Sequence, residues 1–209
     1  MASRWEQPVL EYVVQYLDHL AVGGRAINLA GLDDRLFDAR PDAHPATVSA
    51  RVRELYEKLA RAAREAGRLA HDAPLIKGWK LTGDIYSPKL ERFIEVDERQ
   101  HFSRARLARL LEIRSCVWGP LYPAYFWSEE FPRLRDKPFQ DLDPPHRDEA
   151  RAYRDELREL LPVAYGLRRT IRLDEFTLQD FGLEGVGDLV AQALEAEARD
   201  ARRMSGAEA

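Results

Sequence analysis

The sequence contains one cysteine, Cys116, and no long apolar run. A single cysteine excludes an internal disulfide bond and a cysteine-rich zinc site, and it suits a reducing compartment. No apolar run approaches the roughly 18 residues that indicate a membrane span. Residues 1–20 carry scattered charges and lack an uninterrupted apolar core, so we expect no secretory signal there. These absences predict a cytoplasmic protein that makes no contact with a membrane.

Several common catalytic motifs are also absent. The sequence has no glycine-rich phosphate loop, no Gly-x-Ser-x-Gly elbow and no His-Glu-x-x-His pattern. His19, His44 and His71 are too scattered to form a set of metal ligands. These observations argue against nucleotide hydrolysis of the P-loop kind and against zinc proteolysis.

An excess of positive charge is missing as well. The formal net charge is −4, which argues against nucleic-acid binding by the surface as a whole. The charge is unevenly distributed, because residues 99–114 contain five arginines and only one acid, Glu112. Such a local group can contact phosphates. The alternative is that these arginines cover a solvated helix face.

The 209 residues fit one domain with a sizeable core. Hydrophobic periodicity predicts helices over 7–20, 48–70, 103–114, 147–161 and 187–203, and strands over 75–87, 92–98 and 165–176. We therefore predict a mixed α/β domain. Its parts are an N-terminal helical extension (1–46), a core (47–175) and a C-terminal helical segment (176–209).

The segments 75–87 and 92–98 form a predicted β-hairpin, because both alternate and the turn-like sequence PKLE joins them. If Lys89 and Leu90 lie at the centre of the turn, Asp84 faces Glu95 across the antiparallel pair. Side chains alternate between the two faces of a sheet. One predicted face then carries Lys80, Thr82, Asp84, Tyr86, Phe93, Glu95 and Asp97. The opposite face, predicted to point to the core, carries Leu81, Ile85, Ile94 and Val96.

Three carboxylates, Asp84, Glu95 and Asp97, are thereby brought to one patch. Like charges across a strand pair repel, and burial strengthens the repulsion unless a proton or a cation relieves it. Mg²⁺ is a suitable cation, because it prefers one or two carboxylates together with water and phosphate oxygens. Lys80, on the same predicted face, is a candidate charge partner or catalytic electrophile. The alternative is that this face is simply the solvated side of the hairpin.

The hairpin and its flanks resemble a known family. Asp84, the turn, Glu95-x-Asp97 and the following Gln100-His101-Phe102 resemble the PD-(D/E)XK nuclease superfamily, which has the restriction-endonuclease-like fold. Within it, IEVDERQHF is similar to the branch that includes very-short-patch-repair-like and homing-endonuclease-like enzymes. The resemblance covers about residues 48–114, and LRRTIRL looks like a later core strand. It implies a mixed sheet flanked by helices.

The resemblance assigns roles to the acids. Asp84 matches the family's metal-binding Asp on the second core strand, and Glu95 matches the acid on the third. Asp97 stands where the commonest form of the family has a lysine, which leaves the identity of the general base open. Gly83 stands where a proline often precedes the Asp.

Further residues follow from the same resemblance. The family often adds a metal-binding Glu from the preceding helix, and Glu65 is our choice over Glu54 and Glu57 because it lies nearest the edge of the apolar stripe. His101 is a candidate for proton transfer or for orienting water. Its alternative role is a cap of the next helix. Gln100 is a candidate site residue or a hydrogen-bonding residue at the end of the strand.

The implied function is a Mg²⁺-dependent endonuclease, with Mn²⁺ as a substitute metal and DNA as the expected substrate. Expected contacts to nucleic acid are Arg99, Arg104, Arg106 and Arg109 on the loop and helix after the acidic strand. The aromatic segment 117–127 either stacks bases or closes a core, and we favour the core. A homodimer is compatible with this interpretation. The alternatives are a non-catalytic module of the same fold that binds nucleic acid or protein, and a structural α+β interaction protein.

Overall fold

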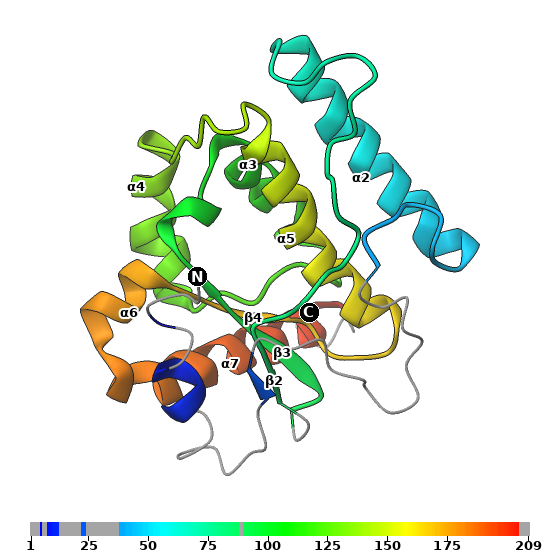
Figure 1. Ribbon diagram of the computed structural model, residues 1–209. Helices are drawn as coiled ribbons and strands as arrows, with labels where there is room; N and C mark the ends of the chain where they lie inside the picture. Colours follow the sequence, from blue (N-terminus) through cyan, green and yellow to red (C-terminus); the bar gives the residue numbers. More distant parts are fainter. Residues whose placement is uncertain (1–4, 6–7, 13–21, 24–37, 88–89, 205–209) are drawn as a thin grey trace.

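A mixed sheet of four strands lies at the centre of the fold (Figure 1). The computed structural model describes residues 5, 8–12, 22–23, 38–87 and 90–204. The strand order is β1 (Val22–Gly23), β2 (Ile85–Ser87), β3 (Arg92–Asp97) and β4 (Ile171–Asp174). Strands β1 and β3 run antiparallel to β2, whereas β4 runs parallel to β3. The predicted mixed α/β class is therefore confirmed.

The hairpin has the predicted register. Ile85 pairs with Ile94, and Tyr86 pairs with Phe93, so Asp84 and Glu95 come next to each other at the open end of the pair. The first strand is much shorter than predicted. Residues 75–84 precede β2 in an irregular conformation, and Lys80 forms only an isolated antiparallel bridge with Asp38.

The helices surround the sheet. They are α2 (Ala46–Glu65), α3 (Arg104–Ile113), α4 (Phe131–Asp136), α5 (Arg147–Ala164), α6 (Glu175–Phe181) and α7 (Val186–Met204). A π-helix, Phe126–Glu130, leads into α4, and short 3₁₀ turns occupy Arg99–His101 and Leu183–Gly185. Ser103 caps α3, as its position before the apolar run predicts, because its hydroxyl accepts a hydrogen bond from the backbone N–H of Arg106 at 3.3 Å.

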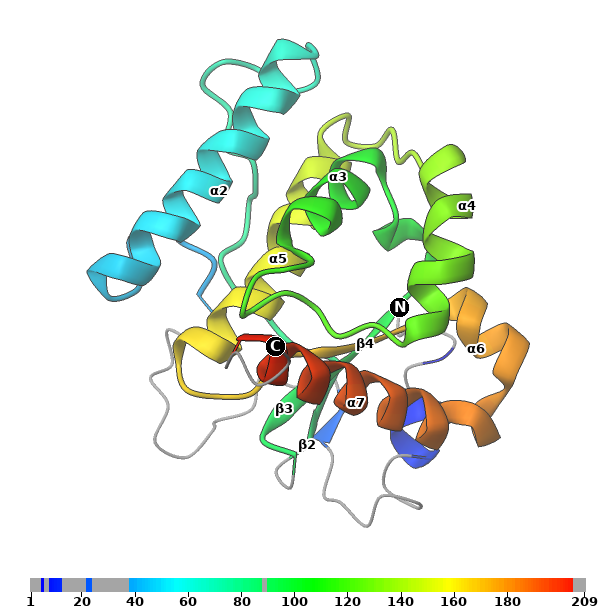
Figure 2. The ribbon, with the colours of Figure 1, turned by 180° about the vertical axis from the view of Figure 1, so that it is seen from behind.

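The two faces of the sheet pack against different helices (Figures 1 and 2). Ile94 and Val96 of β3 share a buried cluster with residues of α6 and α7, whereas Phe93 packs among residues of α2 and α5. Glu95 and Asp97, which point to the same side as Phe93, are buried as well, with 2% and 1% exposure. The solvated-face alternative is therefore wrong for β3. Leu81 was predicted to share a face with Ile94, but it packs in the α2–α5 cluster because the chain before β2 is not a strand.

The aromatic segment after α3 closes a third buried cluster. Tyr122 and Phe126 stack with ring centroids 3.9 Å apart, and they pack beside Phe102, Leu107 and Leu110. The predicted core role of this segment is thus confirmed for both rings. Trp127 lies at the edge of the cluster and is half-buried.

The N-terminal part is described only in pieces. Residues 8–12 are helical, and the rest of the helix predicted over 7–20 lies outside the described residues. Val22–Gly23 pairs with β2 as a short strand that the sequence pattern does not predict. The described helices include none with the length and apolar character needed to cross a membrane.

Candidate acidic site

The structure brings Asp84 and Glu95 together at the end of the hairpin, and we call them the acid pair. The backbone N–H of Asp84 donates to Glu95 Oε1 at 3.0 Å, and the backbone N–H of Val96 donates to Asp84 Oδ2 at 2.9 Å. Each carboxylate thus binds the backbone of the opposite strand. The predicted convergence of these two acids is confirmed.

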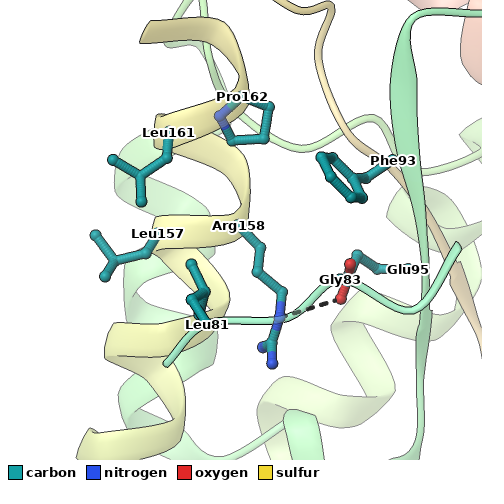
Figure 3. Close-up of a pocket in the computed structure, with 8 residues that line it drawn as sticks. All are labelled: Leu81, Gly83, Phe93, Glu95, Leu157, Arg158, Leu161 and Pro162. Carbon is teal, nitrogen blue, oxygen red and sulfur yellow. Dashed lines mark ion pairs between the residues drawn. The ribbon is translucent and has the colours of Figure 1, made fainter. Parts of the chain in front are cut away.

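Gly83 allows the chain to pass closely over Glu95 (Figure 3). A Cβ atom at this position would lie 2.5 Å from the ring of Phe93 and 3.0 Å from Glu95 Oε1. A side chain therefore does not fit here unless the buried ring moves. Glycine is therefore needed at this position for a steric reason.

Arg158 of α5 faces Glu95 of the acid pair from the neighbouring helix (Figure 3). Its Nε lies 3.4 Å from Glu95 Oε2 and donates a hydrogen bond to the carbonyl oxygen of Thr82 at 2.7 Å. Its Nη1 is 2.9 Å from Asp155 Oδ1. Because its charge is divided among these partners, Arg158 neutralises Glu95 only in part.

The pKa values reflect this incomplete compensation. Burial, followed by the charge of Asp84, raises the pKa of Glu95 well above its ordinary value. Burial also raises the pKa of Asp84, while the hydrogen bond from Val96 and the charge of Arg158 oppose the rise. The acid pair therefore has the tendency expected of a site that takes up a proton or a cation.

Asp97 belongs to a different arrangement, which we call the ion-pair network: Asp97, His101, Arg106, Asp155, Glu159 and Arg172. Arg172 Nη1 of β4 lies 2.5 Å from Asp97 Oδ1, and the hydroxyl of Tyr122 donates to Asp97 Oδ2 at 2.5 Å. Both oxygens of Asp97 are occupied by these bonds. The prediction that Asp97 binds metal therefore conflicts with the structure, because an arginine already supplies the positive charge.

His101 is held between two acids of the ion-pair network. Its Nδ1 lies 3.0 Å from Asp155 Oδ2 and 3.5 Å from Asp97 Oδ1, and its side chain keeps 21% exposure. Burial disfavours the charged ring, but the charge and the hydrogen bond of Asp155 outweigh it, so the pKa of His101 is raised. The ring of His101 therefore lies within reach of solvent, and Asp155 favours its charged form. It does not cap α3, where Ser103 has that role.

Arg106 is buried in the same network and cannot contact nucleic acid. Its guanidinium pairs with Glu159, whose Oε1 also lies 2.8 Å from Arg172 Nε. Arg109 is also committed to α5, because it binds Glu156 at 2.6 and 2.7 Å. These two arginines were predicted to contact phosphates. The structure corrects this for Arg106, which is 1% exposed, and gives Arg109 carboxylate partners instead.

The remaining predicted residues lie apart from the acids. Gln100 donates to Glu98 at 2.8 Å and accepts from Arg151 at 3.3 Å, so it is a hydrogen-bonding residue at the strand end. Lys80 is exposed and forms no ion pair with the acids in the described ranges. Glu65 is exposed at the last turn of α2, whose C-terminal end points away from β3 (Figure 1). Arg99 and Arg104 are exposed, and Arg99 lies over the ring of Phe139.

The acid pair alone fits a divalent cation. In the described part of the chain, no group of three or more His, Cys, Asp and Glu residues is arranged to hold a metal. Within the same residues, Asp84 Oδ1 accepts no hydrogen bond, and Glu95 Oε2 has only the ion pair with Arg158. Two carboxylates, each with one oxygen left, match the small number of protein ligands that Mg²⁺ uses. Asp97 and Glu65 do not belong to this set.

Sequence reasoning missed the partners that α5 and β4 supply. Asp155, Arg158 and Glu159 lie on α5 at helical spacing, and Arg172 lies within the buried strand TIRLD. A charged residue inside a strand of four buried residues is a signal that it has a buried partner. The identity of that partner is not encoded locally, since Arg172 and Asp97 are 75 residues apart.

Comparisons of the chain with protein-family models, with curated proteins and with solved structures found no match.

Proposed function

We propose that the chain is a Mg²⁺-dependent nuclease that hydrolyses phosphodiester bonds, with DNA as the substrate. The observation that carries the proposal is the acid pair: two carboxylates held together by reciprocal backbone bonds, with raised pKa values, beside one shared arginine. Stable burial of two adjacent acids needs a proton or a compensating charge, and a divalent cation would supply that charge.

The restriction-endonuclease-like fold is part of the same proposal. Asp84 directly precedes β2 and Glu95 lies in β3, which are the second and third strands of the sheet. The segment LRRTIRL supplies β4, which was expected to be a later core strand. The positions of the two acids relative to the strands support the resemblance on which the expectation was based.

The proposed roles follow from the geometry of the side chains. Asp84 and Glu95 would hold Mg²⁺, which activates water and stabilises negative charge on the phosphate. Arg158 would bind a phosphate oxygen, since its guanidinium already lies at the acid pair. His101, whose charged form Asp155 favours, would donate a proton to the leaving oxygen. Asp155 is a positioning residue in this scheme, because it acts through the ring of His101.

The first test is a calorimetric titration with Mn²⁺ of the wild type, Glu95→Gln and Glu65→Ala. We expect the wild type and Glu65→Ala to bind Mn²⁺ alike, because Glu65 lies away from the acid pair, and we expect Glu95→Gln to bind at least tenfold more weakly. Plasmid and single-stranded DNA are then incubated with Mg²⁺ and each protein. Loss of cleavage in Glu95→Gln and Asp84→Asn, with Glu65→Ala active, supports the proposal. Equal Mn²⁺ binding by Glu95→Gln contradicts it.

One observation favours a second candidate, a non-catalytic module of the same fold that binds nucleic acid or protein. Asp97 is fully occupied by Arg172 and Tyr122, so one acid of the resembling motif serves the fold. If the acid pair has only a structural role, Mn²⁺ does not bind. Substituting Glu95 by Ala then stabilises the protein, because repulsion from Asp84 is removed.

A further inference from the structure

A second region of the molecule has features of a ligand site that the acid pair does not explain. A groove of about 1140 Å³ runs between the segment after α3, the turn after α5 and the last turns of α7. Its lining comes from residues 114–128, 163–169 and 196–201. Within the described residues it is open to solvent.

The groove has an excess of positive charge in a chain whose net charge is −4. Its two acids already have partners: Asp200 binds Arg169 at 2.8 Å, and Glu197 binds the buried Arg92 at 2.9 Å. Arg114 and Arg168 line the same groove, are exposed, and form no ion pair within the described residues. A polyanion is the ligand class that complements this charge.

Arg114 also offers a flat surface. Its guanidinium lies over the ring of Trp127, with the Cζ atom 4.3 Å from the ring centroid. The indole also packs on the buried aromatic cluster, with its ring centroid 5.2 Å from those of Phe126 and Phe131. Arg114 and Trp127 both line the groove, so the guanidinium is held at the groove by a ring that is itself packed. Unpaired bases stack on arginine planes of this kind.

The groove is linked to the ion-pair network through the side chain of Tyr122. Tyr122 lines the groove, and its hydroxyl donates to Asp97 at 2.5 Å. The neighbouring Leu121 forms a parallel bridge with Ile171 of β4, because its N–H donates to the carbonyl of Thr170 and its carbonyl accepts from the N–H of Arg172. The wall of the groove is thus fixed to the strand that carries the ion-pair network.

We propose that this groove binds a single strand of nucleic acid, with a base stacked on Arg114 and phosphates bound by Arg114 and Arg168. This inference rests on the proposed function, from which it takes nucleic acid as the substrate. It places the nucleic acid in the groove, outside the acid pair. A single strand is favoured over a duplex because stacking on Arg114 requires an unpaired base. An acidic protein has no base to stack, so it would use the charge of the groove alone.

The test uses fluorescence anisotropy to measure the binding of a fluorescein-labelled single-stranded DNA in buffer with EDTA. The DNA has about 12 nucleotides, which is within the site sizes of single-strand binders. We expect Arg114→Ala with Arg168→Ala to weaken binding at least tenfold. The dependence of log K on log salt should become shallower by about 0.7 for each phosphate that the variant no longer neutralises. The matched control is Arg61→Ala with Arg135→Ala, which removes the same charge from exposed positions outside the groove. Equal weakening in both double variants overturns the proposal.

Two further comparisons test the stacked base. Arg114→Lys keeps the charge but loses the plane, so we expect it to bind more weakly than the wild type, and wild-type affinity in this variant overturns the stacking. A duplex of the same sequence should bind at least about tenfold more weakly. Equal binding of the duplex, or equal competition by polyglutamate, overturns the assignment to a single strand.

Failure of this proposal and failure of the nuclease proposal give different results. The groove variants should bind Mn²⁺ as the wild type does, because both arginines lie outside the acid pair. Binding of the oligonucleotide without Mn²⁺ binding or cleavage leaves the groove proposal standing and the nuclease proposal refuted. Mn²⁺ binding and cleavage that are unchanged in the groove variants refute the groove alone.

Discussion

The acid pair and the ion-pair network lie beside each other, and Glu95 of the first differs from Asp155 of the second. The side chains of Glu95 and Asp155 are equally hidden from solvent, with 3% and 0% exposure. The pKa of Glu95 is raised by burial and by Asp84, whereas the pKa of Asp155 is lowered, because His101, Arg172 and Arg106 outweigh its burial. Glu95 and Asp155 thus differ in their nearby cations more than in their burial, whereas the pKa of Glu159 is raised because burial outweighs the charges of Arg106 and Arg172.

On the proposed function, this contrast separates a structural from a functional use of acids. Asp97, Asp155 and Glu159 have arginine or histidine partners in fixed geometry. Glu95 shares Arg158 with Asp155, and the charge of Arg158 also acts on Asp84. We propose that an added cation stabilises the acid pair and has no place in the ion-pair network.

The largest expected effect comes from breaking the ion-pair network. Arg172→Met should lower the free energy of unfolding by about 3–5 kcal/mol, because Asp97 would be left buried without its arginine and Glu159 would keep only Arg106. Urea unfolding measures the change. Arg135→Met, at an exposed position, should stay within about 0.5 kcal/mol of the wild type. A loss below about 1 kcal/mol for Arg172→Met would mean that Arg172 does not compensate the buried acids of the ion-pair network.

Gly83→Ala tests the close approach at the acid pair. The new methyl group would overlap the buried ring of Phe93, so we expect a loss of about 1–3 kcal/mol in unfolding free energy. Mn²⁺ binding should weaken as well, because the backbone that positions Asp84 must shift. Gly78→Ala is the matched control, since its Cβ meets only Arg154 at an ordinary 3.7 Å. Similar losses in both variants would show that the close approach at Gly83 is not special.

The pH dependence of stability tests the charge on Glu95. Its pKa is raised in the folded state, so its contribution to stability is fully present below about pH 4.5, the ordinary value, and is lost as pH rises through the folded pKa. In metal-free buffer, Glu95→Gln should therefore lose less stability than the wild type as pH rises above 4.5. Chemical unfolding at a series of pH values measures the two curves. Glu129→Gln serves as the exposed control. Parallel curves for the wild type and Glu95→Gln would contradict the conclusion that the charge of Glu95 is only partly compensated in the folded protein.

The smallest effect is expected at His101, which faces Asp155, Asp97 and Arg172. The pKa of the ring is raised, so its contribution to stability is present below pH 6.5 and is lost as pH rises through the folded pKa. His101→Gln should cost on the order of 1 kcal/mol, the scale of one charge-assisted hydrogen bond, in mildly acidic buffer. The difference should shrink in alkaline buffer. Exposed His71→Gln is the control, and a difference that is constant with pH would contradict the prediction.

The sequence predicted the hairpin better than its surroundings. Alternation of side chains was enough to place Asp84 opposite Glu95, because register in a hairpin is a local property. The burial of Arg106 was also readable, since it lies four residues before Leu110 and seven before Ile113, on the apolar side of α3. The arginine-rich composition of this helix led instead to the interpretation of a basic surface.

Other features could not be predicted from local patterns. Whether Asp97 binds a metal or an arginine depends on Arg172, which only the folded sheet brings near. The short β2 depends on the path of residues 75–84, which pack in the α2–α5 cluster and do not extend the hairpin. Tertiary contacts overrode the alternating pattern in that segment.

The parallel pairing of β3 with β4 has a consequence for how the protein is made. Strand β3 is complete at Asp97, but the strand that covers its second edge begins at Ile171, after α3, α4 and α5. During synthesis on the ribosome, one edge of β3 therefore stays unpaired, and Asp97 stays without Arg172, until most of the chain has emerged. Chains that stop within α5 should therefore lack β4 and leave this edge of β3 open.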